Sequence, residues 1–264
     1  GIVERVALND SDPLIAALWG TVFSADAQWL ADQVLSVPLT IAEWKRQKSS
    51  TPITMREQAL KALYLNRTSF NGIIHKSGPL GGWGQTNRTL DVRFPREKLS
   101  KRIIELGALK DRVVVTSNLD WRDFVNQLRG EGAFFYLDPP YFHKAEQLYG
   151  RYFDLAGHVA LRDYLEDLSE PWLLSYDDAR EIRELYKPLK LTARVIDSTY
   201  SAHPMGGASF VGRELFFSNL KKLPLPQGNN HEHIGMSVRQ YGRGKHNDSA
   251  ARVPWTQAAL ARTT

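Results

Sequence analysis

A continuous apolar run, Ala133-Phe134-Phe135-Tyr136-Leu137, restricts most strongly what this chain can fold into. Such a run, without alternating polar residues, is typical of a strand that is covered on both faces in a parallel sheet. It stops at Asp138-Pro139-Pro140-Tyr141, hereafter the Asp-Pro-Pro-Tyr turn. Because proline has no backbone N–H and a fixed φ, the two prolines end the strand and hold a rigid, extended turn. That turn presents a carboxylate, main-chain carbonyls and an aromatic ring.

Apolar segments with strand character alternate with amphipathic segments along the rest of the chain. Strands are predicted at residues 4–10, 112–116, 133–137, 172–176, 191–197 and 214–218. Helices are predicted at residues 13–22, 27–34, 55–65, 99–109, 123–128, 161–168 and 179–186. This alternation predicts an α/β fold with a doubly wound, mostly parallel sheet and a terminal antiparallel hairpin. Ligands of such sheets bind at the carboxyl ends of strands, where Asp10, Asp120 and Asp138 lie.

Residues 69–87 interrupt this alternation with a stretch rich in Gly, Asn and Ser. The composition predicts a long loop or hairpin. Long loops inside compact domains are more often functional than short ones. This one carries His75, Lys76 and Trp83, and exposed cations beside a Trp suit contacts with a nucleic-acid backbone.

The composition excludes several classes of protein. The chain of 264 residues contains no Cys, which excludes disulfides, thiolate nucleophiles and Cys-based metal sites. Its 34 Lys and Arg exceed its 29 Asp and Glu, and the net charge of +5 permits nucleic-acid binding. No signal peptide opens the chain and no apolar run is long enough to span a membrane, so we expect a cytoplasmic protein without a membrane partner. We expect no metal, since the pair of His in His231-Glu232-His233 is explained as incidental.

The Asp-Pro-Pro-Tyr turn has the groups needed to hold an exocyclic amine of a nucleobase. A carboxylate and a carbonyl can accept the two amine protons while an aromatic ring stacks on the base. The simpler interpretation is a strand terminator with an incidental Asp.

The turn resembles motif IV of the amino-methyltransferases that use S-adenosylmethionine. With the segments around it, the chain is similar to the Dam-like DNA adenine N6-methyltransferases, in particular their phage and prophage branch. Matching segments follow the order of that family from about residue 4 to residue 219: residues 9–12 (NDSD), 65–72 (LNRTSFNG), 78–83 (GPLGGW), 118–121 (NLDW) and 172–177 (WLLSYD). The resemblance implies a methyltransferase fold, S-adenosylmethionine as cofactor and double-stranded DNA as partner.

The resemblance also implies roles for individual residues. Asp138 and the main-chain carbonyl of Pro139 would hold the adenine amino group, with Pro140 completing the turn and Tyr141 stacking on the flipped base. Direct attack of the amine on the methyl group would need neither a protein nucleophile nor a metal. The residues expected to bind the cofactor are Asp10, Asp120, Trp121 and Asp138.

The expected DNA contacts lie in an inserted target-recognition region at residues 55–100, and they are Asn66, Arg67, Asn71, Lys76 and Trp83. The methyltransferase domain would then comprise residues 1–54 and 101–222. Residues 223–264 are polar and basic and are expected to form a flexible tail.

One departure from the family concerns the cofactor. The family places a Phe-x-Gly-x-Gly loop and a Gly-Gly-Lys segment before the strand that ends at Asp10, and neither precedes it here. We expect the loop to lie in a preceding segment or in a second chain. Two alternatives stay open: a non-catalytic or partner-dependent DNA-binding subunit, and a cytosine-N4 or RNA adenine methyltransferase.

Overall fold

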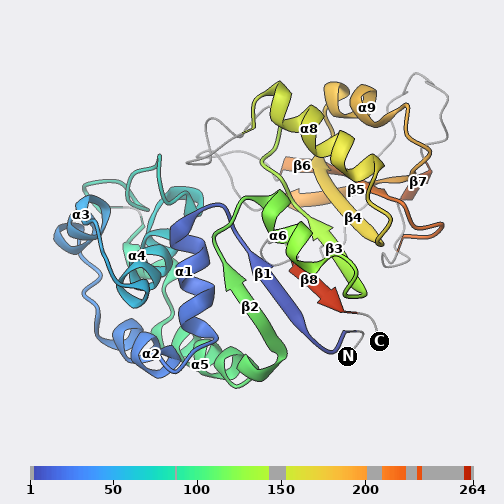
Figure 1. The fold of residues 1–264 in the computed structure, drawn as a ribbon. Coiled ribbons are helices and arrows are strands. Elements are labelled where there is room, and N and C mark those ends of the chain that lie inside the picture. Colours follow the sequence, from blue (N-terminus) through green and yellow to red (C-terminus); the bar gives the residue numbers. More distant parts are fainter. Residues whose placement is uncertain are drawn as a thin grey trace. The chain divides into compact units, whose positions relative to one another are not determined.

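The computed structural model describes residues 3–86, 88–142, 153–200, 210–223, 231–233 and 259–262 (Figure 1). The chain forms two compact units. The first contains the described residues up to Ala133 together with residues 259–262. The second contains the described residues from Phe134 to residue 233.

The strands of the first unit bring two loop regions to one sheet edge. Strand β1 (Val6–Asn9) pairs in parallel with β2 (Val113–Ser117) and antiparallel with β8 (Ala259–Arg262). Asn9 lies opposite Ser117. Its side chain both donates a hydrogen bond to the loop after β2 and accepts one from it. Its amide donates to the Leu119 carbonyl at 3.1 Å, and its Oδ1 accepts from the Leu119 N–H at 2.9 Å. The carboxyl ends of β1 and β2 therefore meet at one edge.

The first unit also contains a group of helices. These are α1 (Pro13–Val22), α2 (Ala27–Ser36), α3 (Ile41–Ser49), α4 (Met55–Thr68), α5 (Arg96–Gly107) and α6 (Trp121–Leu128), with short 3-10 turns η1 (Phe70–Gly72), η2 (Leu90–Arg93) and η3 (Lys110–Arg112). Side chains satisfy their first N–H groups: Asp12 caps α1, Thr40 caps α3, and Thr54 forms a capping box with Glu57 in α4. Helix α1 lies beside β1 and β2, and α4 packs along α1 (Figure 1).

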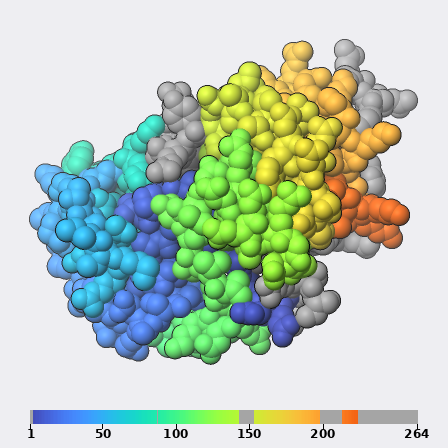
Figure 2. All heavy atoms as spheres, in the orientation of Figure 1, coloured from blue at the N-terminus to red at the C-terminus, as the bar shows by residue number. Residues whose placement is uncertain are grey.

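Helices α1 to α5 pack around a common hydrophobic core. The blue and cyan atoms of α1 to α4 are contiguous in Figure 2. Its fully buried members include Leu30, Val34, Tyr64, Leu65 and Leu90. Residues 55–100 thus share their core with α1–α3 and α5. The boundary predicted at residue 54 does not coincide with a boundary in packing.

The second unit begins with the strand that carries the Asp-Pro-Pro-Tyr turn. Strand β3 (Ala133–Leu137) is parallel to β4 (Trp172–Asp177). Antiparallel pairs then join β4 to β6 (Phe210–Ser218), β6 to β5 (Thr192–Tyr200), and β5 to β7 (His231–His233). The described helices of this unit are α8 (Leu155–Glu166) and α9 (Arg180–Tyr186).

The mixed α/β class predicted from the sequence is confirmed, and β5 and β6 pair as the predicted antiparallel hairpin. Fewer strand pairs are parallel than the sequence predicted: among the described strands, only β1–β2 and β3–β4 are parallel. Strands β7 and β8 explain part of the difference: they lie in the segment predicted to be a flexible tail, and both pair antiparallel. The expectation of a flexible tail is corrected for these two segments. The doubly wound arrangement stays a prediction.

No helix in the described ranges has both the length and the apolar character needed to cross a membrane.

Candidate active site

The Asp138 carboxylate at the end of β3 is held by a buried serine of the neighbouring strand. The Ser175 hydroxyl donates to Asp138 Oδ1 at 2.8 Å, and it also lies 3.0 Å from the Tyr136 hydroxyl. Ser175 is 2% exposed, whereas Asp138 and Tyr136 are half-buried. Burial, and then the Asp138 charge, raise the pKa of Tyr136 to about 12, so its phenol keeps its proton at neutral pH.

Acidic side chains of β4 and β6 anchor the end of the Asp-Pro-Pro-Tyr turn. The Tyr141 hydroxyl donates to Glu214 Oε1 at 3.3 Å, and the Phe142 N–H donates to Asp177 Oδ1 at 2.9 Å. Asp177 and Glu214 are directly opposite each other on β4 and β6. The antiparallel pair of β4 and β6 therefore helps to fix a turn that begins at the end of β3, a strand parallel to β4.

An aromatic cluster that includes His158 borders Phe142, the residue after the turn. His158 Nδ1 lies 2.9 Å from the Tyr176 hydroxyl, and its ring centroid is 5.2 Å from that of Phe142. His158 is 1% exposed, and burial lowers its pKa, so the imidazole is neutral at pH 7. We assign His158 a packing role and not that of a base.

In the first unit, Asp10 lies where β1 and β2 end. Its N–H donates to the Ser117 carbonyl at 3.2 Å, and its own carbonyl accepts from the Asn118 amide at 2.7 Å. Its carboxylate accepts from the Asp12 N–H at 2.8 Å. Burial is the main reason that the pKa of Asp10 is raised to about 6; the Asp12 charge adds to the shift, and the Asp12 N–H opposes it.

Asp120 and Trp121 lie at the start of α6, in the loop that follows β2. Asp120 caps the helix, since its Oδ1 accepts from the Arg122 N–H at 2.9 Å. The Trp121 ring is half-buried, with the Arg122 guanidinium 4.7 Å from its centroid. Asp10 and Asp120 thus supply carboxylates at the ends of adjacent parallel strands, beside an indole. These groups fit a nucleoside, whose ribose hydroxyls donate hydrogen bonds and whose base stacks on aromatic rings.

Two of the predicted DNA-binding residues, Asn66 and Arg67, form hydrogen bonds to main-chain carbonyls of the first unit. The Asn66 amide donates to the Gly72 carbonyl at 3.1 Å, and Arg67 Nε donates to the Arg93 carbonyl at 2.5 Å. Both bonds join the end of α4 to the segments that follow it. The structure gives Asn66 and Arg67 a supporting function that the sequence did not indicate.

The other three predicted DNA-binding residues are exposed. Asn71 has a φ of 54°, so the backbone turns through the left-handed region there. Lys76 is exposed, and the Trp83 side chain is 61% exposed. The Trp83 ring contacts the buried Trp44 ring edge-on, with centroids 5.6 Å apart.

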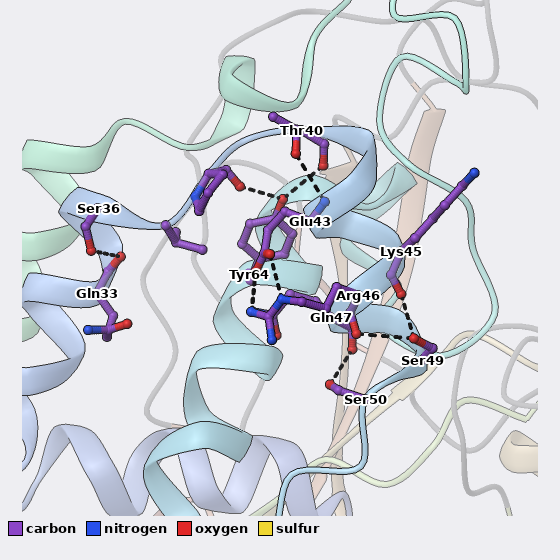
Figure 3. Close-up of polar contacts among 12 residues, drawn as sticks. Gln33, Ser36, Thr40, Glu43, Lys45, Arg46, Gln47, Ser49, Ser50 and Tyr64 are labelled. Carbon is purple, nitrogen blue, oxygen red and sulfur yellow. Dashed lines mark hydrogen bonds and ion pairs between the residues drawn. The ribbon is translucent and has the colours of Figure 1, made fainter.

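Helix α3, which the sequence analysis did not predict, adds two lysines to this region. Lys45 Nζ lies 5.4 Å from the centroid of the Trp83 ring. Figure 3 shows the Lys45 side chain extending away from the polar contacts of α3, in which Arg46 bonds Glu43 at 2.6 and 2.7 Å. Lys48 Nζ instead donates to three carbonyls of the long loop, those of Ile74, His75 and Ser77, at 2.6, 2.9 and 3.3 Å.

The model of the D12 class N6 adenine-specific DNA methyltransferase family matches residues 34–200 of this sequence, which is more than half of its 264 residues. The chain belongs to this family. The resemblance to Dam-like adenine methyltransferases is thereby confirmed. A search of curated proteins finds no match. Members of the family methylate adenine in DNA and generally use S-adenosylmethionine.

The segment that matches the family begins within α2. It includes Asp120, Trp121, the Asp-Pro-Pro-Tyr turn and the predicted DNA-binding residues, whereas Asp10 lies before it. Over the part of the chain that the structure describes, no three His, Asp or Glu side chains gather as metal ligands. The side chains of His231, Glu232 and His233 lie outside that part.

Sequence reasoning missed Ser175, Glu214 and Lys45. One signal for Ser175 was available: it is the single small polar residue within the apolar and aromatic segment that precedes Asp177. A buried hydroxyl in such a strand needs a partner. No comparable signal marked Glu214 or Lys45, because their contacts depend on strand register and loop packing.

Proposed function

We propose that this methyltransferase moves a methyl group from S-adenosylmethionine to N6 of an adenine that has been flipped out of double-stranded DNA. One observation carries the proposal. A carboxylate, Asp138, stands at the carboxyl end of a parallel strand, is oriented by a buried hydroxyl, and is followed by two prolines and a tyrosine. Family membership supplies the reaction class.

The Asp138 carboxylate and the Pro139 carbonyl are proposed to accept hydrogen bonds from the two N–H groups of the adenine amine. These acceptors orient the nitrogen lone pair, which is otherwise delocalised into the ring. S-adenosylmethionine supplies, when bound, a methyl group on a positively charged sulfur. Asp138 and Pro139 would hold the amine nitrogen for direct attack on that methyl group, with the sulfur as leaving group that retains the electron pair of its bond to the methyl carbon. Asp138 is placed to take the proton that the amine loses, so catalysis is mainly positioning and electrostatics.

Tyr141 is proposed to stack on the flipped base. Extruding a base costs a few kcal/mol of lost stacking and pairing, and an aromatic ring offsets part of this cost. The bond from the Tyr141 hydroxyl to Glu214 restricts the ring before the base arrives. A restricted ring loses less conformational entropy on binding.

For the cofactor, Asp10 is proposed to accept hydrogen bonds from the ribose, and Asp120 and Trp121 to hold its adenine. On the DNA side, Asn71, Lys76 and Trp83 are proposed to contact the duplex directly. Asn66 and Arg67 are proposed to support the same region through their bonds to Gly72 and Arg93. Because α1–α5 share one core, we propose that the recognition module includes α1–α3 as well as residues 55–100.

The test is methyl transfer from radiolabelled S-adenosylmethionine to duplex DNA and to RNA, with the product nucleoside identified by mass spectrometry. We expect N6-methyladenine in DNA. Asp138→Ala should abolish transfer and leave DNA affinity within a few-fold, because the substitution removes an acceptor and not a phosphate contact. Asp163→Ala, a change of the same kind at an exposed position of α8, should leave transfer unchanged.

Three outcomes would contradict the proposal. Turnover by Asp138→Ala at the rate of the unmodified protein would remove the catalytic assignment. N4-methylcytosine or methylated RNA as the product would favour the corresponding alternative enzyme. DNA binding without transfer, when the segment or second chain that carries the Phe-x-Gly-x-Gly loop is also present, would favour a non-catalytic subunit.

A further inference from the structure

We propose that Ser175 is a positioning residue for methyl transfer, which orients the Asp138 carboxylate and is itself oriented by Tyr136. The inference rests on the proposed function, because it takes Asp138 as the acceptor of the amine. For holding the adenine amine, the motif comparison assigns roles to the turn alone. The structure adds a hydroxyl from β4 that bonds the Asp138 carboxylate, and a phenol from β3 that bonds this hydroxyl.

The strand pairing brings these three groups together. Leu137 of β3 lies opposite Leu174 of β4, so Asp138 and Ser175 are the next residues on two parallel strands. Tyr136 and Asp138 are separated by two positions, and their side chains therefore project to the same face of β3. A shift of the register by one residue would turn these side chains to the opposite face. The network is therefore a consequence of this pairing.

The proton positions follow from the acceptors. Ser175 has one hydroxyl proton, and two acceptors compete for it: Asp138 Oδ1 at 2.8 Å and the Leu137 carbonyl at 3.5 Å. The carboxylate is closer and charged, so it forms the stronger bond. The Ser175 oxygen can then accept from the Tyr136 hydroxyl at 3.0 Å, whose raised pKa keeps it protonated. The order is Tyr136 to Ser175 to Asp138, with each hydroxyl donating to the next oxygen.

Orientation matters here because the carboxylate must meet an N–H whose direction is set by the stacked base. A free carboxylate rotates about its Cβ–Cγ bond, and the freedom must be lost before the amine can attack. A buried donor on Oδ1 removes that freedom in advance. Small errors of placement in such geometries lower rates by about 100-fold.

Ser218 offers a control within the same sheet. It is also a fully buried serine, and it lies on β6 opposite Leu173, but its hydroxyl donates to the main-chain carbonyl of Trp172. Its hydroxyl is used in that main-chain bond, and it has no proposed role in methyl transfer. Ser218→Ala therefore imitates the packing consequences of Ser175→Ala without the change at the carboxylate.

The experiment measures kcat and KM for DNA and for S-adenosylmethionine. We expect Ser175→Ala to lower kcat by about 10- to 100-fold and to change both KM values by less than about threefold. Tyr136→Phe should lower kcat by about three- to tenfold, and the double variant should be no slower than Ser175→Ala, since Tyr136 acts through Ser175. Ser175→Thr, which keeps the hydroxyl, should recover part of the loss.

The results separate this inference from the proposed function. If Asp138→Ala abolishes transfer while Ser175→Ala matches Ser218→Ala in kcat, the positioning role is wrong and the catalytic assignment stands. If the losses of Ser175→Ala and Tyr136→Phe multiply in the double variant, the two residues act independently and the order of donors is wrong. If Ser175→Ala does not fold, Tyr136→Phe alone decides: an unchanged kcat overturns the role of Tyr136.

Discussion

At the scale of single residues, the Asp10 carboxylate lowers the stability of the fold at neutral pH, although its proposed function requires it. Its pKa is raised from 3.8 to about 6, so the folded protein binds more protons than the unfolded chain between these values. The free energy of unfolding must therefore fall as the pH rises through that window. Above about pH 6 the ionised carboxylate costs at most about 3 kcal/mol. Such a cost is expected where a carboxylate is kept for ligand binding.

We predict that Asp10→Asn raises the melting temperature by a few degrees at pH 8 and not at pH 4. The amide removes the buried charge and can still accept from the Asp12 N–H. Thermal unfolding followed by circular dichroism at both pH values tests this. Asp120→Asn, which keeps a good helix cap, should change neither melting temperature. An equal gain for Asp10→Asn at both pH values would contradict the electrostatic cause.

At the scale of elements, the two lysines of α3 are expected to have different roles: Lys48 supports the long loop, and Lys45 contacts DNA. Lys48 bonds three carbonyls of the long loop, whereas exposed Lys45 lies over Trp83. We predict that Lys48→Met lowers the free energy of unfolding by about 1–3 kcal/mol, because these charged hydrogen bonds are lost. Lys45→Met should change it by less than about 0.5 kcal/mol and should weaken DNA binding a few-fold.

The matched pair is measured by chemical unfolding and by DNA titration at several salt concentrations. Methionine keeps a long apolar stem at both positions, so the comparison isolates the charge. Lys45→Met should reduce the salt slope by about one, as expected for one lost phosphate contact. Equal effects of the two variants on stability would show that Lys48 does not support the loop.

At the scale of the whole molecule, the net charge of +5 permits binding to DNA of any sequence, and with the DNA-methylating family it leads us to predict such binding. Neutralised phosphates release counterions, so we expect affinity for an unrelated duplex to fall at least about tenfold between 50 and 200 mM salt. Fluorescence anisotropy with a labelled duplex measures this. Asp138→Ala should show the same slope, because it removes no cation. A slope near zero would contradict electrostatic binding.

The elements that the sequence predicted are those whose pattern is local. Strands β1 to β6 and helices α1, α2, α4, α5, α6 and α9 lie within a few residues of their predicted bounds. Helix α8 begins at Leu155, a turn and a half before the predicted start at residue 161. Helix α3 was missed because Trp44 and Gln47 are its buried residues, and apart from Ile41 and Ala42 at its start the rest is polar. Strands β7 and β8 were missed because antiparallel pairing uses backbone groups, which every sequence possesses.

The sequence by itself determined the Asp-Pro-Pro-Tyr turn, the helix caps, the basic charge and, through its order of motifs, the methyltransferase family. These are properties of neighbouring residues or of composition. The tertiary structure alone decided that Ser175 bonds Asp138, that Tyr141 bonds Glu214 and that Lys48 supports the long loop. Each of these contacts joins residues far apart in the chain. Their distances depend on strand register and helix packing, which no local pattern encodes.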